Sequence, residues 1–280
     1  MIIVAPYACV AGDAKPFQSQ KPDVSKAMVT FTDIRVFVVS CAQDKERRAT
    51  ALASVAALGL SASWVKAVDA RDGFDVLRPH KDLVRDTFWE ATTIKPGALA
   101  CFISHRLAWK AFLESEAACG IFMEDDSRLM TPPAAMDADI VFLNDRLLTW
   151  AESFDAKTVP DLMALLAKDG IPRGGRFAKA PGGDGYLLTR EGAQRCLERS
   201  EVDGVRCGVD WYLLMLAGGC PPDGESCTEV AALRSMFGAR GPTLTGAFAQ
   251  TAHIENGRHW SSSLGHSHTL EIAALRAALA

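Results

Sequence analysis

The sequence lacks several patterns that identify common classes of protein. Its eight cysteines form no C-x-x-C pair, the spacing of thioredoxin-like redox motifs and of many zinc sites. No uncharged stretch reaches the roughly 18 residues that a membrane-spanning helix needs. No G-x-G-x-x-G follows the first predicted strand, which disfavours a Rossmann dehydrogenase. The net charge of −4 indicates no basic surface for nucleic acid.

The N-terminus lacks the basic segment that begins a secretory signal. Residues 12–26 are polar, contain two prolines and show no hydrophobic periodicity. We therefore expect residues 1–28 to be a flexible extension and residues 29–280 to form one domain. With no disulfide-type cysteine pattern, a reduced cytoplasmic location is expected, with at most peripheral contact with the inner membrane. Cys207, Cys220 and Cys227 lie near one another, but their spacing is not that of a zinc site.

What is present is an alternation of strand and helix patterns. Buried strands are predicted at 34–39, 63–69, 121–126, 138–145 and 185–189. Helices are predicted at 44–59, 98–116, from residue 150 around 160–168, and at 190–200, 208–219 and 269–280. This alternation is typical of an α/β sandwich, in which helices flank a mostly parallel central sheet. The basic, glycine-rich residues 170–183 form a candidate binding loop.

An acidic triplet, Glu124-Asp125-Asp126, ends the strand predicted at 121–126. Neighbouring carboxylates repel one another unless a cation shares the site, and oxygen ligands suit Mg²⁺ or Mn²⁺. A solvated acidic turn is the alternative. Ser40 and Asp69 also follow predicted strands, and ligands of such sheets bind beyond the carboxyl ends of the strands. The sequence therefore predicts a polar site at this edge.

Four groups of segments, in order, carry a resemblance to a known family. They are VFVVSCAQDKERR; AVDARDG; PGALACFISHRLAWKAFLES with IFMEDDSRL; and GGDGYLLTREGAQRCLE with GVDWYLL. Together they resemble glycosyltransferase family 25, the lipopolysaccharide-biosynthesis sugar transferases related to collagen galactosyltransferases. The resemblance implies a GT-A-like, Rossmann-type fold and a nucleotide-diphosphate sugar donor, often UDP-galactose. It also implies transfer with inversion to a saccharide or glycolipid acceptor of lipopolysaccharide or another envelope glycan.

The donor site is assigned to residues at the strand ends and on two helices. Glu124 and Asp126 are the candidate ligands of Mn²⁺ or Mg²⁺, because alternate residues of a strand end share a face. Arg47 and Arg48, early in the first helix, are candidates for the phosphates, or else belong to a solvated basic face. The remaining candidates are Ser40 and Asp69 for the nucleoside, Asp125 beside the metal, and His105, to which the resemblance gives a donor-site role.

Inversion needs a general base that removes the proton of the acceptor hydroxyl. Asp210 is the first candidate, because its aromatic neighbours provide an apolar surround that raises a carboxyl pKa, and Asp184 is the second. An N-cap role for Asp210 is the structural alternative. His253 is a candidate late metal ligand.

Two other functions are compatible with the same residues. A metal-dependent phosphohydrolase would use the carboxylates to activate water, although no D-x-D-x-T nucleophile motif is present. A non-catalytic nucleotide-sugar-binding relative is the other, because Ala98 stands where the family usually has an acidic residue. The sequence leaves the donor sugar, the acceptor, the linkage and the oligomeric state open.

Overall fold

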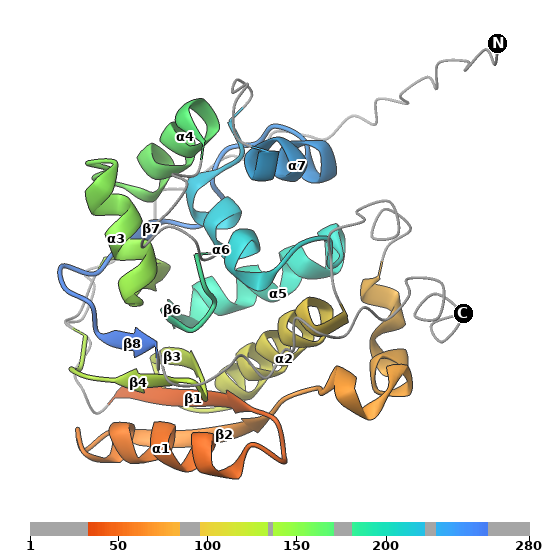
Figure 1. The fold of residues 1–280 in the computed structure, drawn as a ribbon, viewed down its shortest axis with the longest axis vertical. Coiled ribbons are helices and arrows are strands. Elements are labelled where there is room, and N and C mark those ends of the chain that lie inside the picture. Colours follow the sequence, from red (N-terminus) through yellow and green to blue (C-terminus); the bar gives the residue numbers. More distant parts are fainter. Residues whose placement is uncertain (1–32, 85–95, 134–136, 171–180, 222–227, 257–280) are drawn as a thin grey trace.

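A computed structural model describes residues 33–84, 96–133, 137–170, 181–221 and 228–256. Its centre is a six-stranded sheet with the strand order β2-β1-β3-β6-β5-β7 (Figure 1). Only β6 runs against the other five strands, so the predicted mostly parallel α/β sheet is confirmed. The strands are β1 (Ile34–Ser40), β2 (Ser61–Lys66), β3 (Cys119–Glu124), β5 (Ile140–Phe142), β6 (Gly185–Thr189) and β7 (Gly246–Phe248). A separate antiparallel pair joins β4 (Ser127–Leu129) to β8 (Ile254–Asn256).

Helices cover both faces of this sheet. Along β1, Phe37 and Val39 pack into one hydrophobic cluster, while Val36 and Val38 pack into the other, as the alternation of a strand requires. Burial on both faces explains why β1 is a continuous apolar run. The helices are α1 (Lys45–Ala56), α2 (Pro96–Leu113), α3 (Asp145–Ser153), α4 (Val159–Asp169), α5 (Arg190–Asp203), α6 (Val209–Gly218) and α7 (Thr228–Phe237), with short 3₁₀ helices η2 (Ala70–Asp72) and η3 (Phe74–Leu83).

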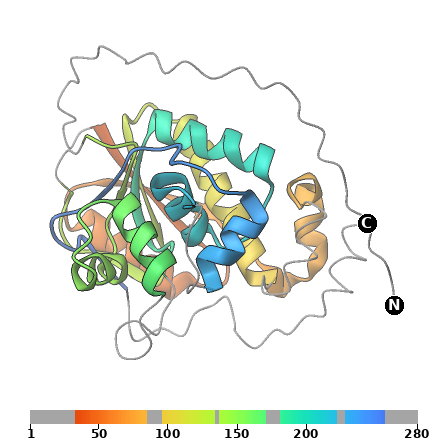
Figure 2. The same cartoon turned by 90° about the horizontal axis from the view of Figure 1, so that it is seen from above.

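The two faces carry different helices. The larger cluster contains residues of α2, α4, α5 and α6, and α2 and α5 pack side by side (Figure 2). Arg106 of α2 joins this pair, because its Nη1 donates to the carbonyl of Leu197 at 3.1 Å. The smaller cluster lies under α1, whose Ala51 and Val55 are fully buried. The resulting layers leave the carboxyl ends of β1 and β3 facing the N-termini of several helices.

Several predicted boundaries were wrong. The second strand ends at Lys66 instead of residue 69, because Asp69 caps η2 by accepting from the backbone of Arg71. The third strand ends at Glu124, so Asp125 and Asp126 lie in the turn to β4. The strand predicted at 138–145 is limited to Ile140–Phe142, since Asn144 already caps α3. β4, β7, β8 and α7 were not predicted, and α3 was not predicted as a separate helix.

Three predictions fall outside the described residues. These are the N-terminal extension at 1–28, the helix at 269–280, and the candidate binding loop apart from its two ends. Within the described ranges, no helix is long and apolar enough to cross a membrane. Cys207 and Cys220 are buried free thiols, while Cys227 is outside the described ranges.

Candidate active site

Six segments of the chain meet at the carboxyl end of β3. Apolar residues bury this strand on both faces, and it ends where its neighbour β1 also ends. The segments contribute the turn Glu124–Asp126, Arg47 of α1, Cys101 and His105 of α2, Arg146 of α3, the turn Gly182–Asp184 before β6, and Asp210 of α6. Polar side chains therefore gather at this edge, as expected, and they include residues that the sequence had not indicated.

Asp125 turns toward α1, away from α2. Its Oδ1 lies 2.6 Å from Nη2 of Arg47, and both side chains are buried. The same guanidinium lies 3.6 Å from Oδ2 of Asp126. Burial raises the pKa of Asp125, although Ser40 and Arg47 oppose the increase. Arg47 thus serves here as the counter-charge of the acidic turn, and the alternative of a solvated basic face is wrong for this residue.

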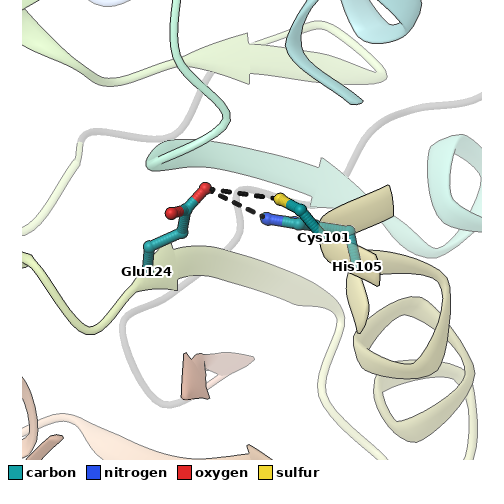
Figure 3. A group of neighbouring side chains, drawn as sticks. All are labelled: Cys101, His105 and Glu124. Carbon is teal, nitrogen blue, oxygen red and sulfur yellow. Dashed lines mark hydrogen bonds and ion pairs between the residues drawn. The ribbon is translucent and has the colours of Figure 1, made fainter. Parts of the chain in front are cut away.

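Glu124 turns the other way, toward α2. Its Oε1 lies 3.7 Å from Sγ of Cys101 and 3.7 Å from Nε2 of His105 (Figure 3). Burial works to raise the pKa of Glu124, but nearby His105, Arg146 and Cys101 outweigh it, and the pKa is lowered. Glu124 is therefore ionised at neutral pH and faces a different set of neighbours from Asp125.

A glycine turn brings Asp184 and Arg146 together. Their side chains form a salt bridge in which Asp184 is almost fully buried. Gly182 has φ +82°, and a Cβ there would meet the Arg146 guanidinium and the Asp184 carboxylate. A Cβ on Gly183 would lie 2.8 Å from Cγ1 of Val209. The two glycines allow the chain to pass this close to the charged groups.

Asp210 lies at the N-terminal end of α6. Its Oδ1 accepts from the backbone of Trp211 at 2.9 Å, and its Oδ2 accepts from the backbone of Gly182 at 3.3 Å. Burial raises the pKa of Asp210, in the predicted direction, although the two backbone donors oppose the increase. The alternative of an N-cap is wrong, because Gly208 holds that position. Asp210 instead ties α6 to the turn before β6.

Among the residues that the structure describes, negative charge is in excess at this site. Five carboxylates (Glu124, Asp125, Asp126, Asp184 and Asp210) stand against the guanidiniums of Arg47 and Arg146. Burial, together with repulsion from Glu124 and Asp184, raises the pKa of Asp126 to about 7. Such an arrangement favours a cation, and its oxygen donors are those that hard divalent ions prefer.

The candidates for the nucleoside and phosphates lie beside this cluster. Asp69 is buried and accepts from Arg71 Nη2 at 2.7 Å and from Gln43. Nη1 of Arg48 donates to the carbonyl of Cys41 at 2.9 Å, and its guanidinium lies 3.9 Å from the ring centroid of Trp64. The cavity between Ser40 and Glu124 has a volume of about 30 Å³. That volume holds a few waters, not a nucleoside.

His253 lies apart from the acidic turn in this structure. Its Nδ1 is 2.7 Å from Oγ1 of Thr131, next to the pairing of β4 and β8. Burial lowers the pKa of His253, which keeps the ring neutral near pH 7. Within the described part of the chain, no group of three metal-binding side chains includes His253. Its role as a metal ligand remains a prediction.

Sequence reasoning missed Arg146 and Cys101, whereas Gly182 and Gly183 lie at the end of the candidate binding loop predicted at 170–183. Asn144 offered a signal for Arg146, because an asparagine after a strand is a common N-cap and places the next residues in a first helical turn. Cys101 and His105 are four residues apart on α2, a spacing that places both on one helix face.

The family model described as glycosyltransferase family 25 (LPS biosynthesis protein) matches residues 33–210. The chain belongs to glycosyltransferase family 25. The match begins next to β1 and ends at Asp210, so it contains every residue of the site described above. Family membership supports glycosyltransferase activity and confirms the resemblance drawn from the sequence.

Two curated mammalian proteins are similar to part of this family-25 chain. They are the "probable inactive glycosyltransferase 25 family member 3" of Rattus norvegicus and the "inactive glycosyltransferase 25 family member 3" of Mus musculus. Each is 32% identical over 102 residues, which is 33% of this chain. The matched region spans only 17% and 16% of those proteins' own lengths.

Proposed function

We propose that this family-25 chain is a metal-dependent, inverting glycosyltransferase. It moves a sugar, galactose or a related hexose, from a UDP-sugar to a saccharide or glycolipid acceptor of lipopolysaccharide or another envelope glycan. The observation that carries the proposal is the excess of buried negative charge beyond β3, with the pKa of Asp126 raised to about 7. A carboxylate cluster of this kind is stabilised by a divalent ion, and a diphosphate donor brings such an ion with it.

The residues at the turn fit Mn²⁺ or Mg²⁺. Glu124 and Asp126 would hold the ion, because their carboxylates offer hard oxygen donors and lie next to the surplus charge. The ion would neutralise the negative charge that develops on the leaving diphosphate. Arg47 holds Asp125 away from this position through their 2.6 Å salt bridge. His253 would join as a ligand through Nε2, because its Nδ1 is engaged by Thr131.

Asp210 is the better candidate for the general base. Its carboxylate is held by two backbone N–H groups, and burial raises its pKa toward the working range. In the reaction it would take the proton of the acceptor hydroxyl while that oxygen attacks the sugar carbon and the diphosphate departs. Asp184 is less suited, because its carboxylate is engaged by Arg146.

Nucleoside binding at Ser40 and Asp69 would require local rearrangement. Arg71 now occupies both carboxylate oxygens of Asp69. A ribose hydroxyl that bonds to Asp69 would therefore compete with Arg71. The 30 Å³ cavity beside Ser40 would also have to widen.

Thermal unfolding with a panel of nucleotide sugars, in Mn²⁺ or in chelator, tests the proposal. A UDP-sugar is expected to raise the melting temperature only with Mn²⁺. Asp126→Ala should remove this shift, whereas Asp75→Ala, at an exposed residue of η3, should keep it. Asp210→Asn should keep the shift and lose sugar transfer. An unchanged shift in Asp126→Ala would exclude the metal role, and transfer by Asp210→Asn would exclude that base.

The same experiment separates two other functions. The mammalian relatives named inactive, together with Ala98 in the first turn of α2, favour a nucleotide-sugar-binding protein without catalysis as the second candidate. That protein would give the Mn²⁺-dependent shift but no transfer in the wild type. A phosphohydrolase would instead release phosphate from phosphate esters without any need for a nucleotide sugar.

A further inference from the structure

Three different metal-binding groups lie close together in the side chains of Cys101, His105 and Glu124. A thiol, an imidazole and a carboxylate face one another where α2 passes the end of β3 (Figure 3). One ligand atom from each lies within 4.8 Å of the other two, and Glu124 Oε1 is 3.7 Å from both partners. Within the described residues, no second group of three such side chains comes this close.

These separations are near those that a tetrahedral transition metal needs. Zinc–ligand bonds of about 2.0–2.3 Å place sulfur, nitrogen and oxygen ligands roughly 3.3–3.6 Å apart at tetrahedral angles. The two separations from Glu124, 3.7 Å each, are close to these values, and the Cys101–His105 separation, within 4.8 Å, shortens to them by side-chain rotation. A thiolate–imidazole pair prefers Zn²⁺ and similar ions over Mg²⁺, Ca²⁺ or Mn²⁺.

The surroundings of His105 resemble those of a histidine that binds a metal ion. The side chain is fully buried, and its Nε2, which points at Glu124 and Cys101, has no hydrogen-bond partner. Its Nδ1 lies 2.7 Å from the hydroxyl of Tyr186, which also accepts from Nε1 of Trp109 at 2.9 Å. A phenolic oxygen can accept two hydrogen bonds, so Nδ1–H can donate to Tyr186 and leave the Nε2 lone pair free.

We propose that Cys101, His105 and Glu124 form a binding site for a thiophilic divalent ion, Zn²⁺ above all, with its fourth position open to water or a phosphate oxygen. The Cys101 thiol loses its proton to solvent when the ion binds. The site shares Glu124 with the hard-ion site of the proposed function but takes a different class of metal. Zn²⁺ bound here withdraws Glu124 from Mn²⁺, so the two ions compete.

Cobalt substitution of the full-length protein tests this site without any sugar donor. Co²⁺ added to the metal-free protein should produce a sulfur-to-cobalt charge-transfer band and the strong visible bands of tetrahedral Co²⁺, and Zn²⁺ should remove both. Cys101→Ser should lose the charge-transfer band. Cys41→Ser, at a cysteine just beyond β1 and outside the group, should keep it. His105→Gln should weaken Co²⁺ binding at least tenfold.

A second measurement on the wild type tests the site even if a variant fails to fold. In the wild type, Zn²⁺ should slow alkylation of Cys101, located by mass spectrometry, and leave the rate at Cys41 unchanged. Absence of the charge-transfer band, its survival in folded Cys101→Ser, or equal alkylation of Cys101 with and without Zn²⁺ would overturn the proposal. None of these outcomes depends on donor binding, so a failure here and a failure of the proposed transferase function are distinguishable.

Discussion

Among single residues, Arg146 is the one whose role is clearest from charge alone. Its guanidinium pairs with buried Asp184, and its positive charge also acts on Glu124 and Asp210. Removing one partner of a buried pair leaves an uncompensated charge, which is strongly destabilising. At this site the effect is larger, because carboxylates already exceed guanidiniums. Arg146 is therefore, with Arg47, one of the two guanidiniums that offset the carboxylates among the described residues of the site.

Arg146→Gln is expected to lower the free energy of unfolding by about 3 kcal/mol in chelator, since it leaves Asp184 buried without this partner. Mn²⁺ should restore part of that loss, because the ion replaces the missing positive charge. Urea unfolding with chelator and with Mn²⁺ measures both effects.

The matched control for this substitution is Arg78→Gln. Arg78 pairs with Asp75, but both side chains are exposed, and such pairs contribute about 0–1 kcal/mol. Equal losses in the two variants would show that Arg146 has no special electrostatic role. A loss in Arg146→Gln that Mn²⁺ does not change would separate the arginine from the proposed metal site.

Residue types explain which parts of the site were predictable. Glu124, Asp126, Asp184 and Asp210 were predicted because carboxylates beside strand ends and helix starts suit cation binding and proton transfer, and the family motifs contain them. Asp125 was expected beside the metal but faces Arg47, because the turn after Glu124 breaks the alternation of the strand. Arg146 pairs with a residue 38 positions later, and nothing in the local sequence indicates such a partner.

Among the elements, the start of α3 links secondary structure to the site. The Asn144 side chain caps α3 by accepting from the backbone of Leu147 at 2.9 Å. Its amide also donates to the carbonyl of Gly182 at 3.2 Å. One buried side chain therefore fixes both the helix that carries Arg146 and the turn that carries Asp184.

Asn144→Ala should cost about 1–3 kcal/mol of stability, because it removes a cap and leaves buried backbone groups unpaired. It should also weaken Mn²⁺-dependent donor binding, since Arg146 and Asp184 lose their common support. Urea unfolding and donor titration measure the two effects.

The control variant Thr158→Ala separates a loss of stability from a loss of donor binding. Thr158 caps α4 through a capping box with Asp161, and its loss should cost about 1 kcal/mol. The contacts of this cap are within α4, so donor affinity should stay at the wild-type value. Equal weakening of donor binding in both variants would mean that general destabilisation, not the link through Asn144, is responsible.

Elements were predicted well where apolar periodicity was strong and poorly where strands were short. β1, α2, β6 and α5 were found within a few residues of their bounds. β4, β7 and β8 have three residues each, too few for an alternating pattern to stand out. Their positions are decided by pairing with distant strands, as β7 is by β5.

In the whole molecule, one sheet joins the two parts of the chain that build the site. The early strands β1, β2 and β3 continue into the late strands β6, β5 and β7 through the antiparallel pairing of β3 with β6. The larger hydrophobic cluster also contains residues from both parts, including Phe37 and Tyr212. The site is therefore complete only when both parts are folded together.

This continuity predicts a single unfolding transition that a donor shifts as a whole. Calorimetry should give equal calorimetric and van't Hoff enthalpies. With Mn²⁺ and UDP-galactose at 100 times the dissociation constant, the stabilisation should be about 2.7 kcal/mol. Two transitions, of which the ligands shift only one, would mean that the early strands and the late strands unfold separately. The donor would then bind to only one of these two groups of strands. That result would contradict a site in which Arg47 and Glu124 come from the early part of the chain and Arg146 and Asp210 from the late part.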